Sequence, residues 1–113
     1  MRVSTWAAVA VAAAVGLPGA AHRASAQDIT IGVSVSTTGP AAALGVPEKN
    51  AIEFVPTEIG GAKIKIIVLD DAGDPTAATT NARRFVTESN ADMIVGSSTT
   101  PPSIAISTVA NEV

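Results

Sequence analysis

The 113-residue chain has no cysteine and no tyrosine, and it contains one histidine, one tryptophan and two phenylalanines. Without cysteine, a disulfide framework, a C-x-x-C redox motif and a cysteine-ligated zinc site are all excluded. The chain also lacks a run of basic residues, and its formal net charge is −3. Nucleic acid and anionic membrane surfaces are therefore not expected as partners. Because there is no cysteine and only one histidine, no metal site is expected either.

The motifs of common α/β enzymes and nucleotide-binding proteins are missing as well. No G-x-G-x-x-G sequence follows the first predicted strand, and Gly39–Gly45 lacks the G-K-[ST] ending of a phosphate-binding loop. No G-x-S-x-G elbow surrounds Ser97 or Ser98, so neither serine is marked as a nucleophile. We therefore expect no cofactor and no enzymatic activity.

The first 26 residues are typical of a secretory signal peptide. Arg2 supplies a positive charge, Trp6–Val15 is apolar, and Ala24-Ser25-Ala26 is a small-x-small cleavage sequence. The apolar run is too short to cross a bilayer, which takes roughly 20 residues. Cleavage after Ala26 would remove His22 and two of the seven basic residues but none of the ten acidic ones, leaving a formal charge of −5. An uncleaved anchor and a chance alanine-rich helix are the alternative interpretations, and Gly19-Ala20-Ala21 is a second possible cleavage point.

Three segments of the remaining chain are typical of β-strands. Residues 28–35 alternate apolar with small or polar residues, and Asp92–Gly96 is a short, mainly apolar segment. Lys63–Leu69 ends in a continuous Ile-Ile-Val-Leu run. Such a run is typical of a strand buried on both faces of a parallel sheet. The segment from Glu58 to Gly61 is predicted to be a plain turn.

Helices are predicted between these strands. The first is expected over Pro47–Val55, because Pro56 would remove a helix hydrogen bond, and Ala41–Gly45 is either a loop or a first helical turn. Asp74-Pro75 supplies a cap and a first helical residue for the second helix, which should run to about Ser89.

A third helix is predicted to begin at Pro101 or Pro102, with Thr100 as its cap. The order is then β-α-β-α-β-α, which predicts an α/β fold with a parallel sheet and crossover helices. Three strands and three helices are fewer than a closed α/β domain needs, so we expect an incomplete domain. The inward face of the third helix should be formed by three residues at helical spacing, namely Ile104, Thr108 and Val109.

The carboxyl ends of the strands are where an open parallel sheet binds its ligands. Here the three turns are Ser36–Pro40, Asp70–Pro75 and Gly96–Thr100, and the first and third are rich in hydroxyl groups. Hydroxyls beside the N–H groups of a helix N-terminus suit a carboxylate or another small anion. The three aspartates of the middle turn lack EF-hand spacing, and we interpret them as a solvated turn plus a helix cap.

Three stretches, taken in order after the signal peptide, are similar to one known family. They are Ile29–Pro40 (ITIGVSVSTTGP), Leu69–Ala78 (LDDAGDPTAA) and Ile94–Ser103 (IVGSSTTPPS). Together they resemble the periplasmic leucine/isoleucine/valine-binding proteins, the substrate-binding components of ABC-type branched-chain amino-acid importers. The resemblance implies a type I periplasmic-binding fold whose two α/β lobes close on an amino acid, with a membrane permease as partner. Residues 27–113 would be an incomplete N-terminal lobe.

The resemblance also implies which residues hold the ligand. Ser97, Ser98 and Thr99 match the loop that receives the ligand's α-carboxylate through hydroxyl and backbone N–H groups. Leu44 matches a position that is often aromatic in close relatives and borders the same cleft. The ligand would be an amino acid, branched-chain or related, or a similar small carboxylate. A receptor's ligand-sensing module, an exported hydrolase and a non-functional truncated remnant are the alternatives.

Overall fold

The computed structural model describes residues 26–113, so the predicted signal peptide lies outside the described residues except for its last position. Within this part, no helix has both the length and the apolar character needed to cross a membrane. The elements are, in order, β1 (Ile29–Val35), α1 (Ala42–Ile52), β2 (Glu58–Ile59), β3 (Ala62–Asp70), α2 (Pro75–Thr87), β4 (Met93–Val95) and α3 (Thr100–Ala110).

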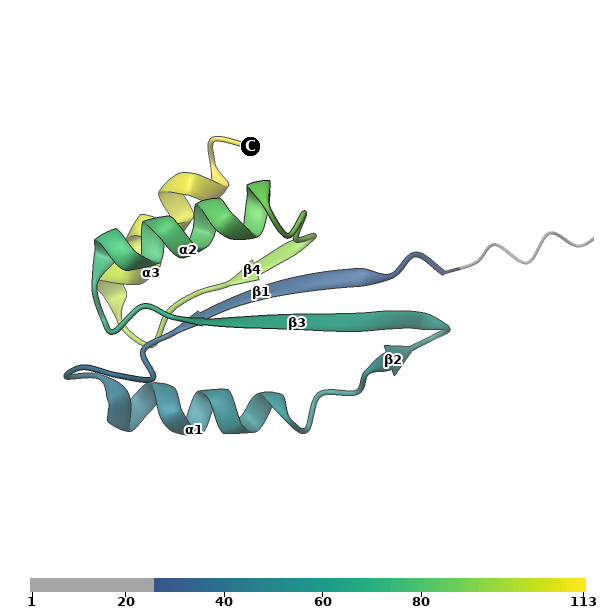
Figure 1. The fold of residues 1–113 in the computed structure, drawn as a ribbon, viewed down its shortest axis with the longest axis horizontal. Helices are drawn as coiled ribbons and strands as arrows, with labels where there is room; N and C mark the ends of the chain where they lie inside the picture. Colours follow the sequence, from purple (N-terminus) through teal and green to yellow (C-terminus); the bar gives the residue numbers. More distant parts are fainter. Residues whose placement is uncertain (1–25) are drawn as a thin grey trace, which may run out of the picture.

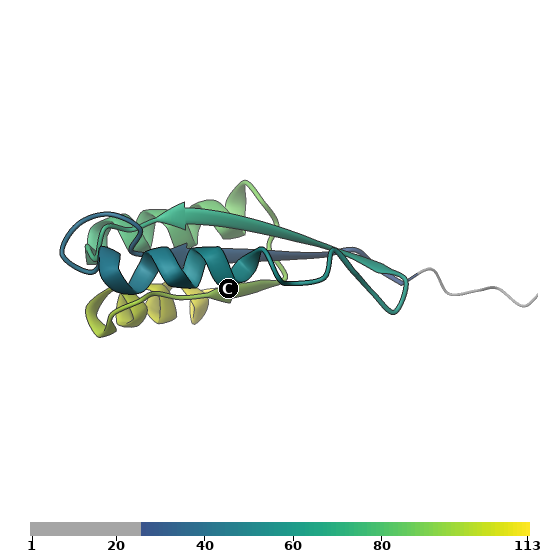
Figure 2. The same ribbon diagram turned by 90° about the horizontal axis from the view of Figure 1, so that it is seen from below.

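The sheet has the strand order β2-β3-β1-β4, and helices lie on both of its faces. Strand β1 is central and runs parallel to β3 from Ile29↔Ile64 onward and to β4 from Ile31↔Met93 onward. Helix α1 lies on one face, whereas α2 and α3 lie side by side on the other (Figures 1 and 2). The predicted α/β fold with parallel strands is confirmed.

The turn predicted over residues 58–61 is confined to Gly60 and Gly61, because Glu58 and Ile59 form the first strand of a short hairpin. Strand β2 pairs antiparallel with β3 through Glu58↔Lys63 and Ile59↔Ala62. The two residues between them, Gly60 and Gly61, have φ angles of 60° and 86°. Two consecutive left-handed residues form the kind of tight turn that joins antiparallel strands, and glycine adopts that conformation without a steric penalty.

Helix α1 begins at Ala42, which confirms the alternative that the segment before Pro47 is a first helical turn. Pro47 therefore lies inside the helix and is not its first residue. Alanine is the strongest helix former, and the small residues before Pro47 allow the helix to start early. Gly45 is buried, and a Cβ atom there would collide with the backbone of Ser36. The absence of a side chain at this position therefore lets α1 begin directly against the end of β1.

Helix α2 begins as the sequence predicts. The Asp74 carboxylate accepts a hydrogen bond of 2.7 Å from the N–H of Ala77, and Pro75 occupies the first helical position. The helix ends at Thr87, two residues earlier than expected, and Asn90 follows with a left-handed φ of 46°. Asparagine tolerates that conformation better than most residues and can reverse the chain after a helix.

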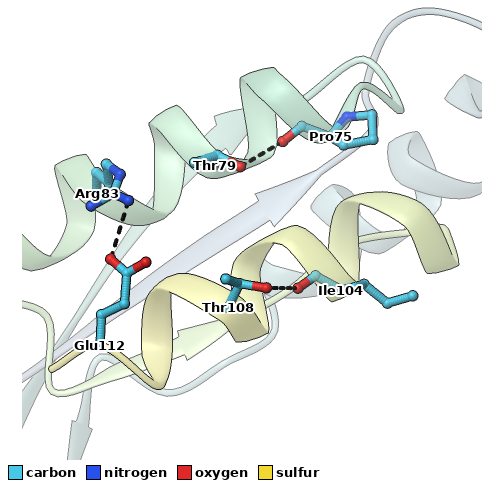
Figure 3. Close-up of polar contacts among 6 residues, drawn as sticks. All are labelled: Pro75, Thr79, Arg83, Ile104, Thr108 and Glu112. Carbon is cyan, nitrogen blue, oxygen red and sulfur yellow. Dashed lines mark hydrogen bonds and ion pairs between the residues drawn. The ribbon is translucent and has the colours of Figure 1, made fainter.

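Helix α3 presents a different face to the protein than predicted. Thr99, not Thr100, is the N-cap, and it makes no side-chain cap bond. Val109 is buried as expected, but Ile104 is 60% exposed and the Thr108 hydroxyl bonds the Ile104 carbonyl on the outer surface (Figure 3). The prediction assumed that α3 packs on the sheet alone. In the structure α3 also packs along α2, which turns Ile106 inward in place of Ile104.

The contact between α2 and α3 has an apolar core and a polar edge. Ala78 and Ala82 of α2 are fully buried against Ile106 and Val109 of α3. At the surface, Arg83 pairs with Glu112 at 3.1 Å (Figure 3). Both ionic side chains are about half exposed, so this pair adds little stability and the buried residues hold the two helices together.

The face of the sheet towards α1 is covered less completely. A groove of about 450 Å³ separates α1 from the sheet and is lined mainly by apolar side chains. The run Ile66–Leu69 was predicted to be buried on both faces, but these residues are only half-buried. Phe54, just after α1, is 87% exposed. Packing is therefore tighter on the face that carries α2 and α3.

Replacing Gly32 by alanine should destabilise the protein, because the added methyl group would overlap the fully buried Phe85 ring. Overpacking of this kind typically costs about 1–3 kcal/mol in free energy of unfolding. Chemical denaturation measures the loss. The double variant with Phe85→Leu should lose less free energy of unfolding than the sum of the losses in the two single variants, because the smaller side chain leaves room for the methyl group. A Gly32→Ala protein as stable as the wild type would contradict this packing.

Candidate functional site

The carboxyl ends of β1, β3 and β4 meet around one buried carboxylate, that of Asp71. Its Oδ2 atom accepts hydrogen bonds from the hydroxyls of Ser34 at 2.8 Å and Ser97 at 2.7 Å. Its Oδ1 atom accepts from the hydroxyl of Ser36 at 2.7 Å and from the N–H of Gly73 at 2.9 Å. One side chain therefore connects the ends of all three parallel strands.

The interpretation of the acidic turn as a solvated turn is wrong for Asp71, which is fully buried. Asp70 is exposed, but its carboxylate accepts from the N–H groups of Thr37, Thr38 and Ala72 and from the Thr38 hydroxyl. Only Asp74 acts as a simple helix cap, as predicted. In residues 26–113, no three acidic, histidine or cysteine side chains come together as a metal-binding group.

Hydrogen bonding keeps both carboxyls ionised. Burial alone would raise the pKa of Asp71, but the bonds from Ser97, Ser36, Gly73 and Ser34 together lower it below the usual value. For Asp70, desolvation alone would again raise the pKa. The bonds from the Thr38 hydroxyl and the neighbouring N–H groups outweigh it and lower the pKa to about 2.

Asp70→Asn should reduce stability at neutral pH and have no effect in strong acid. The pKa of Asp70 is about 2 in the folded protein and about 3.9 in the unfolded chain. Because the folded pKa is the lower one, ionised Asp70 stabilises the fold above about pH 4, and this stabilisation is lost as the pH falls to about 2. The gap in unfolding free energy between wild type and variant should therefore close from about pH 4 to about pH 2.

Unfolding by denaturant at several pH values measures this gap. Glu53→Gln is a matched control, because the Glu53 carboxylate makes no hydrogen bond within residues 26–113. A gap for Asp70→Asn that stays constant down to pH 2 would show that the bonds to Asp70 do not depend on its charge.

The predicted residues Ser97, Ser98 and Thr99 line one pocket of about 400 Å³ at the N-terminus of α3. Its other lining residues are mostly hydroxyl-bearing and belong to the first turns of α3. Leu44 is not among them. It lies on α1 with 53% of its surface exposed. The structure thus brings three of the four predicted residues together, whereas Leu44 lies on the neighbouring helix.

The hydroxyls of Ser97 and Ser98 are already engaged within the protein. Ser97 donates to Asp71, and Ser98 donates to the carboxylate of Glu48 while accepting from the N–H of Ser36 at 3.1 Å. Sequence reasoning missed Glu48, which approaches from α1 and gives no local signal of its role. These two hydroxyls therefore hold the loop after β4 in place.

Free donors remain on the same loop. Among residues 26–113, no recorded hydrogen bond uses the N–H groups of Ser98, Thr99 or Thr100, or the two threonine hydroxyls. Pro101 and Pro102 have no N–H, so the first turn of α3 offers fewer amide donors than an ordinary helix. The free amides lie at the positive end of the helix dipole and suit an anion.

The pocket can hold a ligand but has no means of breaking a bond. No acidic or basic side chain lines it, so it contains no general base and no counter-charge for a cation. Five uncharged donors on one loop match the acceptor oxygens of a carboxylate. The geometry therefore supports recognition of a carboxylate.

Residues 28–113 match the model of a family described as periplasmic binding protein. The chain belongs to this family. Over 118 aligned residues it is 36% identical to Leu/Ile/Val-binding protein homolog 3 of Brucella melitensis biotype 1, an alignment that covers 99% of this chain and 31% of that protein. The resemblance to the leucine/isoleucine/valine-binding family is confirmed.

Solved structures show the same fold. An extracellular ligand-binding receptor from Rhodopseudomonas palustris is 77% identical, with a TM-score of 0.74, and the match covers 76% of this chain and 24% of that one. A solute-binding protein of an ABC transporter from R. palustris BisB5, solved with 3,4-dihydroxybenzoic acid, is 26% identical, with a TM-score of 0.68 and coverages of 75% and 24%. The chain spans about a quarter to a third of these relatives' lengths.

The relatives agree with two expectations from the sequence. Their structures have the type I periplasmic-binding fold, of which this chain matches a part. They are binding proteins and not enzymes, which confirms the expectation that this family member is not an enzyme.

Proposed function

We propose that this chain is part of the substrate-binding component of an ABC-type importer. It holds an amino acid or a similar small carboxylate in a cleft between two lobes and presents it to a membrane permease. The observation that carries this proposal is the set of free N–H and hydroxyl donors at the N-terminus of α3. The amino acids named for the Brucella relative and the dihydroxybenzoic acid bound by the BisB5 protein share a carboxylate.

In this proposal the predicted site residues have different roles. The N–H groups of Ser98 and Thr99, with that of Thr100, bind the ligand carboxylate. The hydroxyls of Ser97 and Ser98 stabilise the loop that carries these N–H groups. Leu44, exposed on α1, borders the cleft and contacts the rest of the ligand.

The proposal includes export to the periplasm. The basic, apolar and small-residue regions of residues 1–26 support a cleaved signal peptide. Residues 27–113 then belong to the N-terminal lobe, in line with their match to about a quarter of each structural relative. Membership of the periplasmic binding protein family supports the same location.

Binding of acids and of their primary amides tests the proposed carboxylate site. Calorimetry on the full-length protein would use leucine, isoleucine, valine and 3,4-dihydroxybenzoate, each paired with its primary amide. At least one acid should bind, and its amide should bind at least about tenfold more weakly, because it lacks the charge that the α3 N-terminus favours. Equal affinity for an acid and its amide would contradict a carboxylate site.

Thr100→Glu should abolish the preference for an acid over its primary amide without unfolding the protein. A negative charge in the first turn of α3 repels a ligand carboxylate but favours the helix itself. Affinity for the acid should fall at least about tenfold. Thr76→Glu makes the same change in the exposed first turn of α2 and should leave the affinity unchanged. Equal loss in both variants would mean that charge alone, and not its position, weakens binding.

A further inference from the structure

The loop between β4 and α3 has little support from its own strand. Strand β4 has three residues and, within residues 26–113, pairs with β1 alone; Met93 and Val95 are 49% and 43% exposed. The position of the loop therefore depends strongly on the side-chain bonds that Ser97 and Ser98 make to other elements. Among these, the bond from Ser97 reaches the fully buried carboxylate of Asp71, which also binds the ends of β1 and β3.

The direction of the protons around Asp71 follows from its charge. An ionised carboxylate has no proton to donate, so Ser34, Ser36 and Ser97 must each donate to it. The Ser97 proton therefore points away from the pocket, and the hydroxyl cannot at the same time donate to a ligand carboxylate. Besides the hydroxyls of Thr99 and Thr100, the loop presents its backbone N–H groups to a carboxylate, and their direction depends on how the loop is held.

We propose that Asp71 is a positioning residue for ligand binding, which acts through Ser97 to aim the N–H groups of Ser98, Thr99 and Thr100 at the ligand carboxylate. This inference rests on the proposed carboxylate site. Asp71 itself does not line the pocket. Its effect is to fix the loop after β4 relative to the ends of β1 and β3, so that the donors are in place before the ligand arrives.

Asp71→Asn tests the link with little change in side-chain volume. The amide oxygen must face the N–H of Gly73, which leaves the NH₂ group facing the hydroxyls of Ser34 and Ser97. An NH₂ group cannot accept a hydrogen bond, so Ser97 has to turn its proton or move. Ser34→Ala is the matched control, because it removes a bond to the same carboxylate oxygen while leaving the Ser97 bond in place.

The first readout is the ratio of affinities for an acid and its primary amide in the full-length protein. A general loss of stability would weaken binding of the acid and of the amide alike, whereas misdirected N–H groups would weaken binding of the acid selectively. Asp71→Asn should reduce the ratio at least about tenfold, and Ser34→Ala should keep it within about twofold even where their melting temperatures fall equally. An unchanged ratio for Asp71→Asn, or an equal fall for Ser34→Ala, would overturn the inference.

The second readout is hydrogen exchange at the backbone amides of Ser98, Thr99 and Thr100. In Asp71→Asn these amides should exchange at least about tenfold faster, while those of β1 should follow global stability alone. Uniform acceleration in both segments would show a purely structural role. If Asp71→Asn does not fold, Ser97→Ala removes the same bond from the other side and should give the same two results.

A combined variant separates positioning from direct contact. If Asp71 acts through Ser97, Asp71→Asn with Ser97→Ala should reduce the acid-to-amide ratio no further than either change alone. Additive losses would mean that Ser97 contacts the ligand independently, and would overturn the inference. A wild-type protein that does not distinguish acid from amide would instead contradict the proposed function, so the two failures are distinguishable.

Discussion

The buried carboxylate of Asp71 is the constraint on which the arrangement of the site depends. A buried charge is costly unless it is fully hydrogen-bonded, and Asp71 obtains four donors from the ends of β1, β3 and β4. Those donors can reach one carboxylate only if the three strand ends converge. Satisfying the charge therefore brings together the loops that form the ligand site, and the site's geometry follows from the needs of the fold.

Polar groups near the site divide into those that hold the protein together and those left for a ligand. The hydroxyls of Ser97 and Ser98 belong to the first group, because both already donate to carboxylates. The N–H groups from Ser98 to Thr100 and the hydroxyls of Thr99 and Thr100 belong to the second. Two prolines in the first turn of α3 limit the amide donors to this short segment. A site of this kind recognises the carboxylate common to many ligands and leaves selectivity to residues elsewhere.

Local sequence patterns predicted the elements well, because strand alternation and the Asp74-Pro75 helix start depend only on neighbouring residues. Features that depend on distant partners were missed. The inward face of α3 is set by α2, and the burial of Asp71 is set by three serines far from it in sequence. One signal was available: Ser34 of β1 and Ser36 just after it are two residues apart in extended chain and point the same way, and two inward hydroxyls at a strand end need a buried polar partner.

A crystal structure of the full-length protein with its tightest-binding acid would test the central claim most directly. The account predicts that the ligand carboxylate accepts hydrogen bonds from the N–H groups of Ser98, Thr99 and Thr100, while the Ser97 hydroxyl remains bonded to Asp71. A carboxylate bound elsewhere, for example in the apolar groove between α1 and the sheet, would contradict it.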